Sequence, residues 1–170
     1  MKEIIYNYDY LEEDEINNVV VRVKAVVVNN KNGILLGFGH KNFQLIGGHV
    51  EEGETFEDAL VREVEEETGI EIEKKVRQPF LVIKYYCRDY PEQGQNTKYI
   101  ANYYEVDTVF EPNYQKINLT DNEKEGMFEL KYLSKRTILK ELEENVDFCS
   151  NSNVVLDTIE VIKEYLKNHK

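Results

Sequence analysis

Hydrophobic residues recur along this chain at two different periods, one typical of strands and one typical of helices. Residues 19–28 read VVVRVKAVVV, a β-branched run, and a second apolar stretch follows at residues 34–39. Gly33 lies between them and suits the positive φ of a tight turn, so a β-hairpin is predicted. Residues 40–54 hold several glycines and no helical period, which predicts a loop.

Three amphipathic stretches further along predict helices. The first spans residues 55–68, with Thr55 as a capping residue and Gly69 at its end. The second is capped by Ser134 and runs to about residue 144. The closing helix starts at residue 152 and places four apolar side chains at helical spacing: Val155, Ile159, Ile162 and Leu166.

The other apolar stretches alternate or run continuously in the manner of strands. They are residues 70–76, 79–87, 99–106 and 127–133. The polar stretch 118–126 is predicted as a loop. Residues 1–18, rich in tyrosine and acid, are predicted as an extended arm or an edge strand. No repeat or long linker divides the chain, so residues 1–170 are predicted to form a single domain.

The size and the charge of the chain exclude several classes of protein. A chain of 170 residues can bury one sizeable hydrophobic core. It carries 21 Lys and Arg against 33 Asp and Glu, a formal net charge of −12. This charge argues against binding to duplex nucleic acid or to an anionic membrane, because both need a basic surface. Hydrophobic residues make up 41% of the chain, too many for a disordered one.

Neither a membrane span nor a disulfide framework is expected. Residues 19–28, the longest apolar stretch, have about half the ~20 residues that a spanning helix needs and are interrupted by charges. The N-terminal residues are acidic where a signal peptide would be apolar, so a cytoplasmic location is predicted. Cys87 and Cys149 are too few and too far apart for a cysteine metal site, and are predicted to be buried free thiols.

A cluster of acids on the predicted helix 55–68 points to a metal site. At 100° per residue, Glu63, Glu66 and Glu67 fall within one 100° arc, so their carboxylates share one face. Like charges at this spacing destabilise a helix by a few tenths of a kcal/mol per pair, so a compensating cation is expected. Carboxylate oxygens suit Mg²⁺ or Mn²⁺, which also take water and substrate phosphates as ligands.

Neighbouring residues are expected to support this site. Arg62 lies one turn before Glu66, where its guanidinium can orient a carboxylate through paired hydrogen bonds. Gly47 and Gly48 permit a tight bend through which a carbonyl oxygen can approach a metal or a phosphate. An apolar stripe is predicted to anchor the helix to the core: Phe56, Leu60 and Val64.

The spacing of these residues is far from random. The pattern G-x5-E-x7-R-E-U-x-E-E-x-G-U, with U aliphatic, is satisfied in full by residues 48–70. A chance match in a chain of this composition is on the order of one in a million. The fixed positions are Gly48, Glu54, Arg62, Glu63, Val64, Glu66, Glu67, Gly69 and Ile70. The segment resembles the complete signature of the Nudix (MutT-like) hydrolases.

This resemblance implies a fold and an activity. The fold would be α/β, the Nudix-type α/β/α sandwich with a central mixed β-sheet. The activity would be hydrolysis of a small-molecule nucleotide, a nucleoside diphosphate linked to another moiety, at its pyrophosphate linkage by water that a divalent metal activates. The implied cofactor is Mg²⁺ or Mn²⁺. One departure from the pattern is Ile46, where family members often carry proline, and it would loosen the turn without removing a ligand.

The matched positions also imply roles for individual residues. Glu54 and Arg62 would support the geometry of the loop and helix, and Arg62 is counted with the catalytic group. The implied metal ligands are Gly48 through its carbonyl and the carboxylates of Glu63, Glu66 and Glu67.

The general base is left open between two places in the chain. Glu66 and Glu67 on the helix are the preferred candidates, and Glu123 and Glu125 in the polar stretch 118–126 are the alternatives. A solvated turn explains the latter pair equally well.

The substrate and the oligomeric state are less constrained. Tyr85 or Tyr86 lies where dinucleoside polyphosphate hydrolases carry a tyrosine, whereas neither Pro79 nor Pro91 lies where ADP-ribose hydrolases carry a proline. Oxidised or normal nucleoside triphosphates, dinucleoside polyphosphates and nucleotide sugars all remain candidates, and a homodimer is kept as an option. The alternative function is a non-catalytic nucleotide sensor on the same fold. An acidic calcium-binding or scaffold protein is disfavoured, because the Asp-rich spacing of calcium loops is absent from the sequence.

Overall fold

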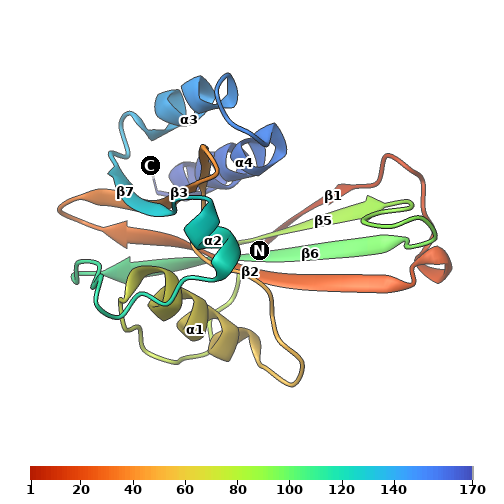
Figure 1. Ribbon diagram of the computed structural model, residues 1–170, viewed down its shortest axis with the longest axis horizontal. Coiled ribbons are helices and arrows are strands. Elements are labelled where there is room, and N and C mark those ends of the chain that lie inside the picture. The colour runs from red at the N-terminus through yellow and green to blue at the C-terminus, as the bar shows by residue number, and fades with distance from the viewer. Residues whose placement is uncertain (170) are drawn as a thin grey trace.

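The computed structural model describes residues 1–169, which form one mixed β-sheet with helices on both faces. The strands are β1 (Lys2–Tyr6), β2 (Asn18–Asn29), β3 (Gly33–Gly39), β4 (Asn42–Gln44), β5 (Leu81–Cys87), β6 (Thr97–Thr108) and β7 (Glu129–Leu133). The helices are α1 (Phe56–Thr68), α2 (Asp121–Glu125), α3 (Ile138–Val146) and α4 (Ser152–Asn168). Figure 1 shows α1 below the sheet, with α3 and α4 above it. The predicted α/β sandwich is confirmed.

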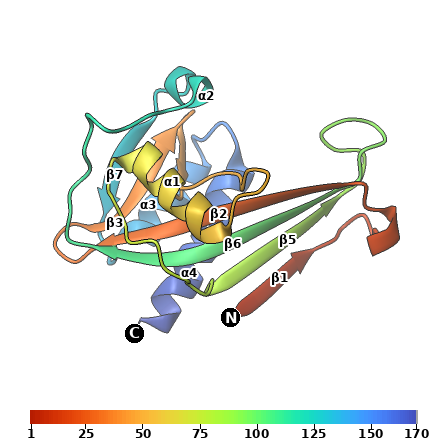
Figure 2. The ribbon, with the colours of Figure 1, turned by 90° about the horizontal axis from the view of Figure 1, so that it is seen from below.

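The sheet has the order β1-β5-β6-β2-β3-β4, with β7 paired to β3. β2 and β6 run parallel along their whole length, while β5 and β6 run antiparallel. β1 lies at the edge of the sheet, parallel to β5. Of the two structures predicted for the N-terminal residues, an extended arm or an edge strand, the edge strand is therefore the one observed. In Figure 2 the start of β1 lies near the end of α4, and Lys2 forms an ion pair with Glu164 of α4 at 2.9 Å.

Alternation along β2 divides the core into two layers. Val23, Ala25 and Val27 face α1, whereas Val26 and Val28 face α3 and α4. All five side chains are at most 2% exposed. A strand that is covered on both faces reads as a continuous apolar run, which is why residues 25–28 are all apolar.

The predicted hairpin is confirmed, but the loop predicted after it contains a strand. β2 and β3 pair antiparallel, and Gly33 has φ +108° at the turn. Within residues 40–54, β4 pairs with β3. The Phe43 ring packs against Phe38 at 4.9 Å between centroids, and the backbone N–H of Phe43 donates to Asn145 at 3.0 Å. Contacts with these distant residues stabilise β4, and the hydrophobic periodicity of the segment itself does not predict it.

The structure also differs from the prediction at one predicted strand and at one predicted loop. Residues 70–76 alternate as a strand would, but the structure assigns no strand between α1 and β5. Their isoleucines pack under α1 while Val76 is 80% exposed, because the segment crosses the molecule rather than joining the sheet. The polar stretch 118–126 holds the short helix α2, capped by Thr120, whose hydroxyl accepts from the Glu123 N–H at 3.4 Å.

The helix predictions are mostly right. α1 and α4 match the predicted ranges, and among the described residues no helix is long and apolar enough to cross a membrane. α3 starts at Ile138 instead of directly after Ser134, because Ser134 first closes a turn by accepting from the N–H of Arg136 at 3.2 Å. Cys87 and Cys149 are free and partly buried.

Candidate active site

α1 is fixed at both ends and along its buried face. The Thr55 hydroxyl accepts from the Asp58 N–H at 3.2 Å, and Gly69 ends the helix with φ +68°. Leu60 and Val64 are at most 1% exposed and hold the helix to the sheet. Phe56, predicted to belong to the same stripe, is 42% exposed and does not, because it lies at the first turn beyond the edge of the core.

The glycine pair before α1 forms a bend that lies against carboxylates of the helix. Gly47 has φ +124°, and a Cβ there would lie 2.3 Å from the carbonyl oxygen of Val23. A Cβ on Gly48 would lie 2.6 Å from both carboxylate oxygens of Glu63. Only glycine permits this approach, so the backbone of the bend is in direct contact with the acidic face of α1.

Glu67 reaches the same bend from the next turn of α1. Its side chain is 5% exposed, and its carboxylate accepts a hydrogen bond from the Gly47 N–H at 3.1 Å. Burial raises the pKa of Glu67 to about 8, a shift that outweighs the lowering effect of the nearby Lys24 ammonium. Glu67 is therefore the least solvated carboxylate of the cluster.

Lys24 of β2 also lies at this site, and the sequence analysis missed it. Its ammonium donates to the carbonyl oxygens of Leu45, at 3.2 Å, and of Gly47. Burial lowers the pKa of Lys24, and the negative charges of Glu67 and Glu63 oppose that shift. The one signal in the sequence is a lysine within the apolar run of residues 19–28, where a buried cation needs a partner.

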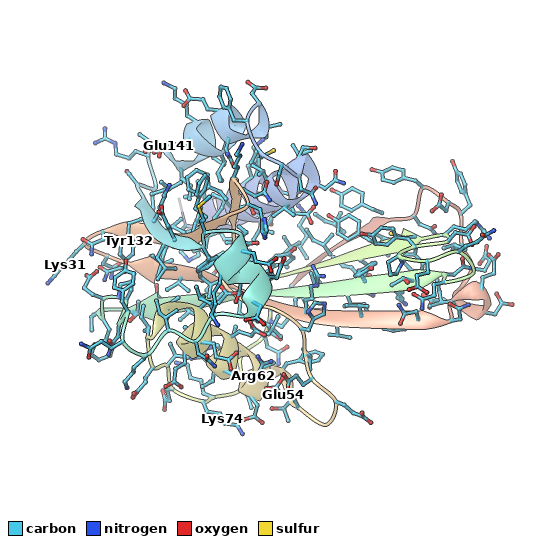
Figure 3. The ribbon with its side chains drawn as sticks, in the orientation of Figure 1. Lys31, Glu54, Arg62, Lys74, Tyr132 and Glu141 are labelled. Carbon is cyan, nitrogen blue, oxygen red and sulfur yellow. The ribbon has the colours of Figure 1, made fainter. Side chains whose placement is uncertain are left out.

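Arg62 gathers the remaining acids: it contacts Glu66 as predicted, but its paired contact is with Glu54. Its guanidinium makes a paired contact with Glu54, at 2.9 and 3.0 Å, and the two side chains meet where the loop enters α1 (Figure 3). The same guanidinium donates through one nitrogen to Glu63 at 2.8 Å and to Glu66 at 3.1 Å. Hydrogen bonding to Arg62 lowers the pKa of Glu54. Arg62 thus positions both the loop and two carboxylates.

The carbonyl predicted as a ligand is already engaged within the backbone. The Gly48 oxygen accepts from the Val23 N–H at 3.0 Å, which ties the bend to β2. The Gly47 oxygen instead faces the Lys24 ammonium. Of the two carbonyls, that of Gly48 is therefore held by the backbone of β2 and that of Gly47 by a side chain.

The donors of this cluster suit a hard divalent ion, although they do not converge on one point. Among residues 1–169, no three His, Cys, Asp or Glu side chains are arranged around a common point as a metal site would require. Arg62 holds Glu63 and Glu66, while Glu67 is held by the bend. The donor types, carboxylate and carbonyl oxygens beside a close backbone approach, nevertheless fit Mg²⁺ or Mn²⁺.

The two acids of the polar stretch differ in their surroundings. The carboxylate of Glu123 caps α2, accepting from the Thr120 N–H at 2.6 Å. It also lies close enough to the site that its charge raises the pKa of Glu67. Glu125 is exposed. Of the alternative bases, the structure therefore brings Glu123 near the site and leaves Glu125 outside it.

Fold and site together define a class, and comparison with known proteins gives the family. The arrangement of an acidic helix behind a glycine bend at the edge of a mixed sheet is that of a nucleotide pyrophosphohydrolase. A sequence model described as the NUDIX domain matches residues 19–148. The chain belongs to the Nudix family.

Solved structures share the fold at low sequence identity. A NUDIX hydrolase from Nitrosomonas europaea has a TM-score of 0.60 and 18% identity, over 89% of this chain and 90% of that chain. The dihydroneopterin triphosphate pyrophosphohydrolase of E. coli has a TM-score of 0.57 and 17% identity, over 87% and 95%. A MutT protein from Methanosarcina mazei Go1 has a TM-score of 0.56 and 19% identity, over 89% and 97%.

Proposed function

We propose that this chain hydrolyses the pyrophosphate linkage of a nucleoside diphosphate-X substrate with the help of Mg²⁺ or Mn²⁺. The observation that carries the proposal is the direct contact of Glu63 and Glu67 with the Gly47–Gly48 bend. It brings carboxylate and carbonyl oxygens together on rigid elements. Site residues held by packing and hydrogen bonds need little rearrangement to act.

The proposed metal ligands are the three carboxylates of the signature and one carbonyl of the bend. The carbonyl is that of Gly47 in place of Gly48, because the Gly48 oxygen is bonded to Val23. The carboxylates are those of Glu63, Glu66 and Glu67. When bound, the ion would neutralise charge on the pyrophosphate oxygens and acidify water.

The chain's own residues then have distinct tasks. Glu67 is our choice for the proton acceptor, because Arg62 holds the carboxylates of Glu63 and Glu66 but not that of Glu67. Arg62 orients those two carboxylates and, through Glu54, the loop that carries the bend. Lys24 offers positive charge beside the bend, where an anionic substrate would approach a chain of net charge −12.

The test is a matched pair of substitutions on α1. Glu67→Gln removes the proposed base and keeps the shape of the side chain, whereas Glu65→Gln removes an equal charge from a neighbouring position outside the cluster. With a nucleotide that the wild type hydrolyses, Glu67→Gln should lower kcat by about 10²–10⁴-fold. Glu65→Gln should stay within about threefold, the range expected of a surface change.

The assay also separates the enzyme from the alternative, a nucleotide sensor. The panel should contain nucleoside triphosphates, dinucleoside polyphosphates, nucleotide sugars and dihydroneopterin triphosphate, at alkaline pH with Mg²⁺ or Mn²⁺. Nucleotide binding without turnover of any member would favour the sensor. Equal rates for wild type and Glu67→Gln would refute the proposed base. The homodimer and the cytoplasmic location stay predictions.

A further inference from the structure

Lys24 already places a positive charge at the oxygen that the proposed function assigns to the metal. Its ammonium donates to the Gly47 carbonyl, and to the Leu45 carbonyl at 3.2 Å. If a divalent ion approached the Gly47 oxygen while the ammonium stayed there, two cations would repel each other across one atom. Lys24 and the ion therefore compete for the same carbonyl.

The ammonium also lies in the electrostatic field of the acidic cluster. Burial lowers the pKa of Lys24, and the negative charges of Glu67, Glu63 and Glu123 act in the opposite direction. The hydrogen bonds of the ammonium nevertheless go to carbonyl oxygens and not to these carboxylates. Lys24 thus offsets the repulsion within the cluster without holding any of its acids.

Of the two cations at the site, Lys24 is the one that can leave. Arg62 donates to three carboxylates and to the His49 carbonyl, and its paired contact with Glu54 fixes the guanidinium (Figure 3). The Lys24 ammonium sits at the end of a flexible four-carbon stem. Lys24 also lines an open cleft between the sheet and α4, so its side chain has space into which it can move.

The presence of this cation also explains why the carboxylates do not meet at a common point. Glu67 accepts from the Gly47 N–H at 3.1 Å, while Glu63 lies against Gly48. With an ammonium beside the bend, the acids need no shared ion to offset their repulsion. Departure of the ammonium would leave them uncompensated next to a free carbonyl oxygen, and these are the donors that Mg²⁺ and Mn²⁺ prefer.

We propose that the Lys24 ammonium is a built-in counter-ion of the acidic cluster, and that a divalent ion binds by displacing it from the Gly47 carbonyl. Lys24 keeps its proton and its charge, and its side chain moves toward the open cleft. The device keeps the acids gathered in the metal-free protein, and it lowers the affinity for metal. This inference rests on the proposed function, because the ion that it concerns is the ion of that site.

Binding of Mn²⁺ alone, measured by calorimetry at alkaline pH without nucleotide, tests the competition. Lys24→Met keeps an unbranched apolar side chain and removes the ammonium, so it should bind Mn²⁺ about 10–100-fold more tightly than the wild type, because the repulsion from a fixed charge is gone. Lys98→Met is the matched control. Lys98 is a partly buried lysine of β6 whose partner is Glu13, at 2.6 Å, and its loss should change the Mn²⁺ affinity by no more than about twofold.

Melting curves establish whether each variant is folded. Wild-type or weaker binding of Mn²⁺ by folded Lys24→Met would overturn the competition. A cation that stayed in place would also repel the metal, so a gain in affinity needs a second measurement that follows the side chain itself.

The second measurement is the rate of reductive methylation of each lysine in the wild type, followed by mass spectrometry of its peptides. Without metal, Lys24 should react slowly, because its ammonium is partly buried and hydrogen-bonded. Saturating Mg²⁺ should raise its rate toward that of Lys140, whose side chain is 79% exposed, and leave the rate of Lys98 unchanged. An unchanged rate for Lys24 would overturn the displacement. This measurement needs no variant, so it decides the matter even if Lys24→Met does not fold.

The outcomes separate this inference from the proposed function. Release of Lys24 by Mg²⁺ supports the displacement even if no nucleotide of the panel is hydrolysed. If hydrolysis depends on Mg²⁺ but Lys24 is not released, the proposed function stands and the displacement is wrong. Failure of both the wild type and Lys24→Met to bind Mn²⁺ would refute the proposed metal site and this inference together.

Discussion

Substitution of Gly48 by alanine tests whether the glycine bend positions the carboxylates of α1. The added Cβ would lie 2.6 Å from both oxygens of Glu63, whereas ordinary van der Waals contact begins at 3.4 Å. The carboxylate must therefore retreat by about 0.8 Å, or the bend must move by a similar amount. Misplacement of a reacting group by about 1 Å lowers a rate by about 10²-fold, so we expect a loss of that order in kcat/KM.

The same substitution should leave the fold nearly as stable as before. Gly48 does not have a positive φ, and the atoms that it would meet belong to the end of a flexible side chain rather than to backbone. Replacement of glycine by alanine also stabilises a fold by about 0.4–1 kcal/mol, because it reduces the conformational entropy of the unfolded chain. The free energy of unfolding should therefore change by no more than about 1 kcal/mol, which urea denaturation measures.

The control is Gly39→Ala, another glycine without a positive φ. Its Cβ would meet the Phe128 ring at 3.4 Å and no carboxylate, so kcat/KM should stay within about twofold of the wild type. A folded Gly48→Ala protein with wild-type kcat/KM would refute the reasoning, because the carboxylate would then tolerate the displacement. Loss of activity in both variants would point to general damage rather than to Glu63.

Two further predictions concern stability. Hydrogen bonding to Arg62 keeps the pKa of folded Glu54 below its ordinary value of 4.5, so the stabilising effect is complete above that value and is lost as the pH falls through the folded pKa. Urea denaturation between about pH 6 and pH 3 should thus show a steeper loss of stability for wild type than for Glu54→Gln, and equal slopes would contradict the ion pair. Gly47→Ala combines φ +124° with a Cβ 2.3 Å from the Val23 carbonyl oxygen, so it should destabilise the fold by more than the about 1–3 kcal/mol expected from backbone strain alone. Gly53→Ala, with φ +79° and open space around the Cβ, isolates the strain, and equal unfolding free energies for the two variants would exclude the clash.

Local signals explain what the sequence predicted correctly about the fold. α1 has an apolar stripe between a capping threonine and a terminal glycine, and its bounds were predicted to within one residue. β4 lacks such internal signals, because it is held by partners from elsewhere in the chain. α2 has a local signal, the capping box of Thr120 and Glu123, but its five residues include no buried residue and so show no apolar stripe. Residues 70–76 show the opposite error, since their alternation is real but they pair with no strand of the sheet.

The candidate site likewise has one part that local sequence spacing predicts and another that it does not. The helical period places Glu63, Glu66 and Glu67 correctly on one side of α1, because spacing within a helix is a local property. The pairing of Arg62 with Glu54 depends on the path of the loop, and the position of Lys24 depends on β2 lying beside the bend. Neither relation can be calculated from spacing along the chain.

The cations around the bend connect the stability of the site with its proposed chemistry. Clustered carboxylates repel one another, and in this chain Arg62 and Lys24 offset that repulsion from two sides. Because both cations are held by carbonyl or carboxylate oxygens, the acids remain gathered before any ligand arrives. Both cations lie at carbonyl oxygens of the bend or of the residue that follows it, within a protein of net charge −12. An anionic substrate would therefore be drawn toward the glycine bend.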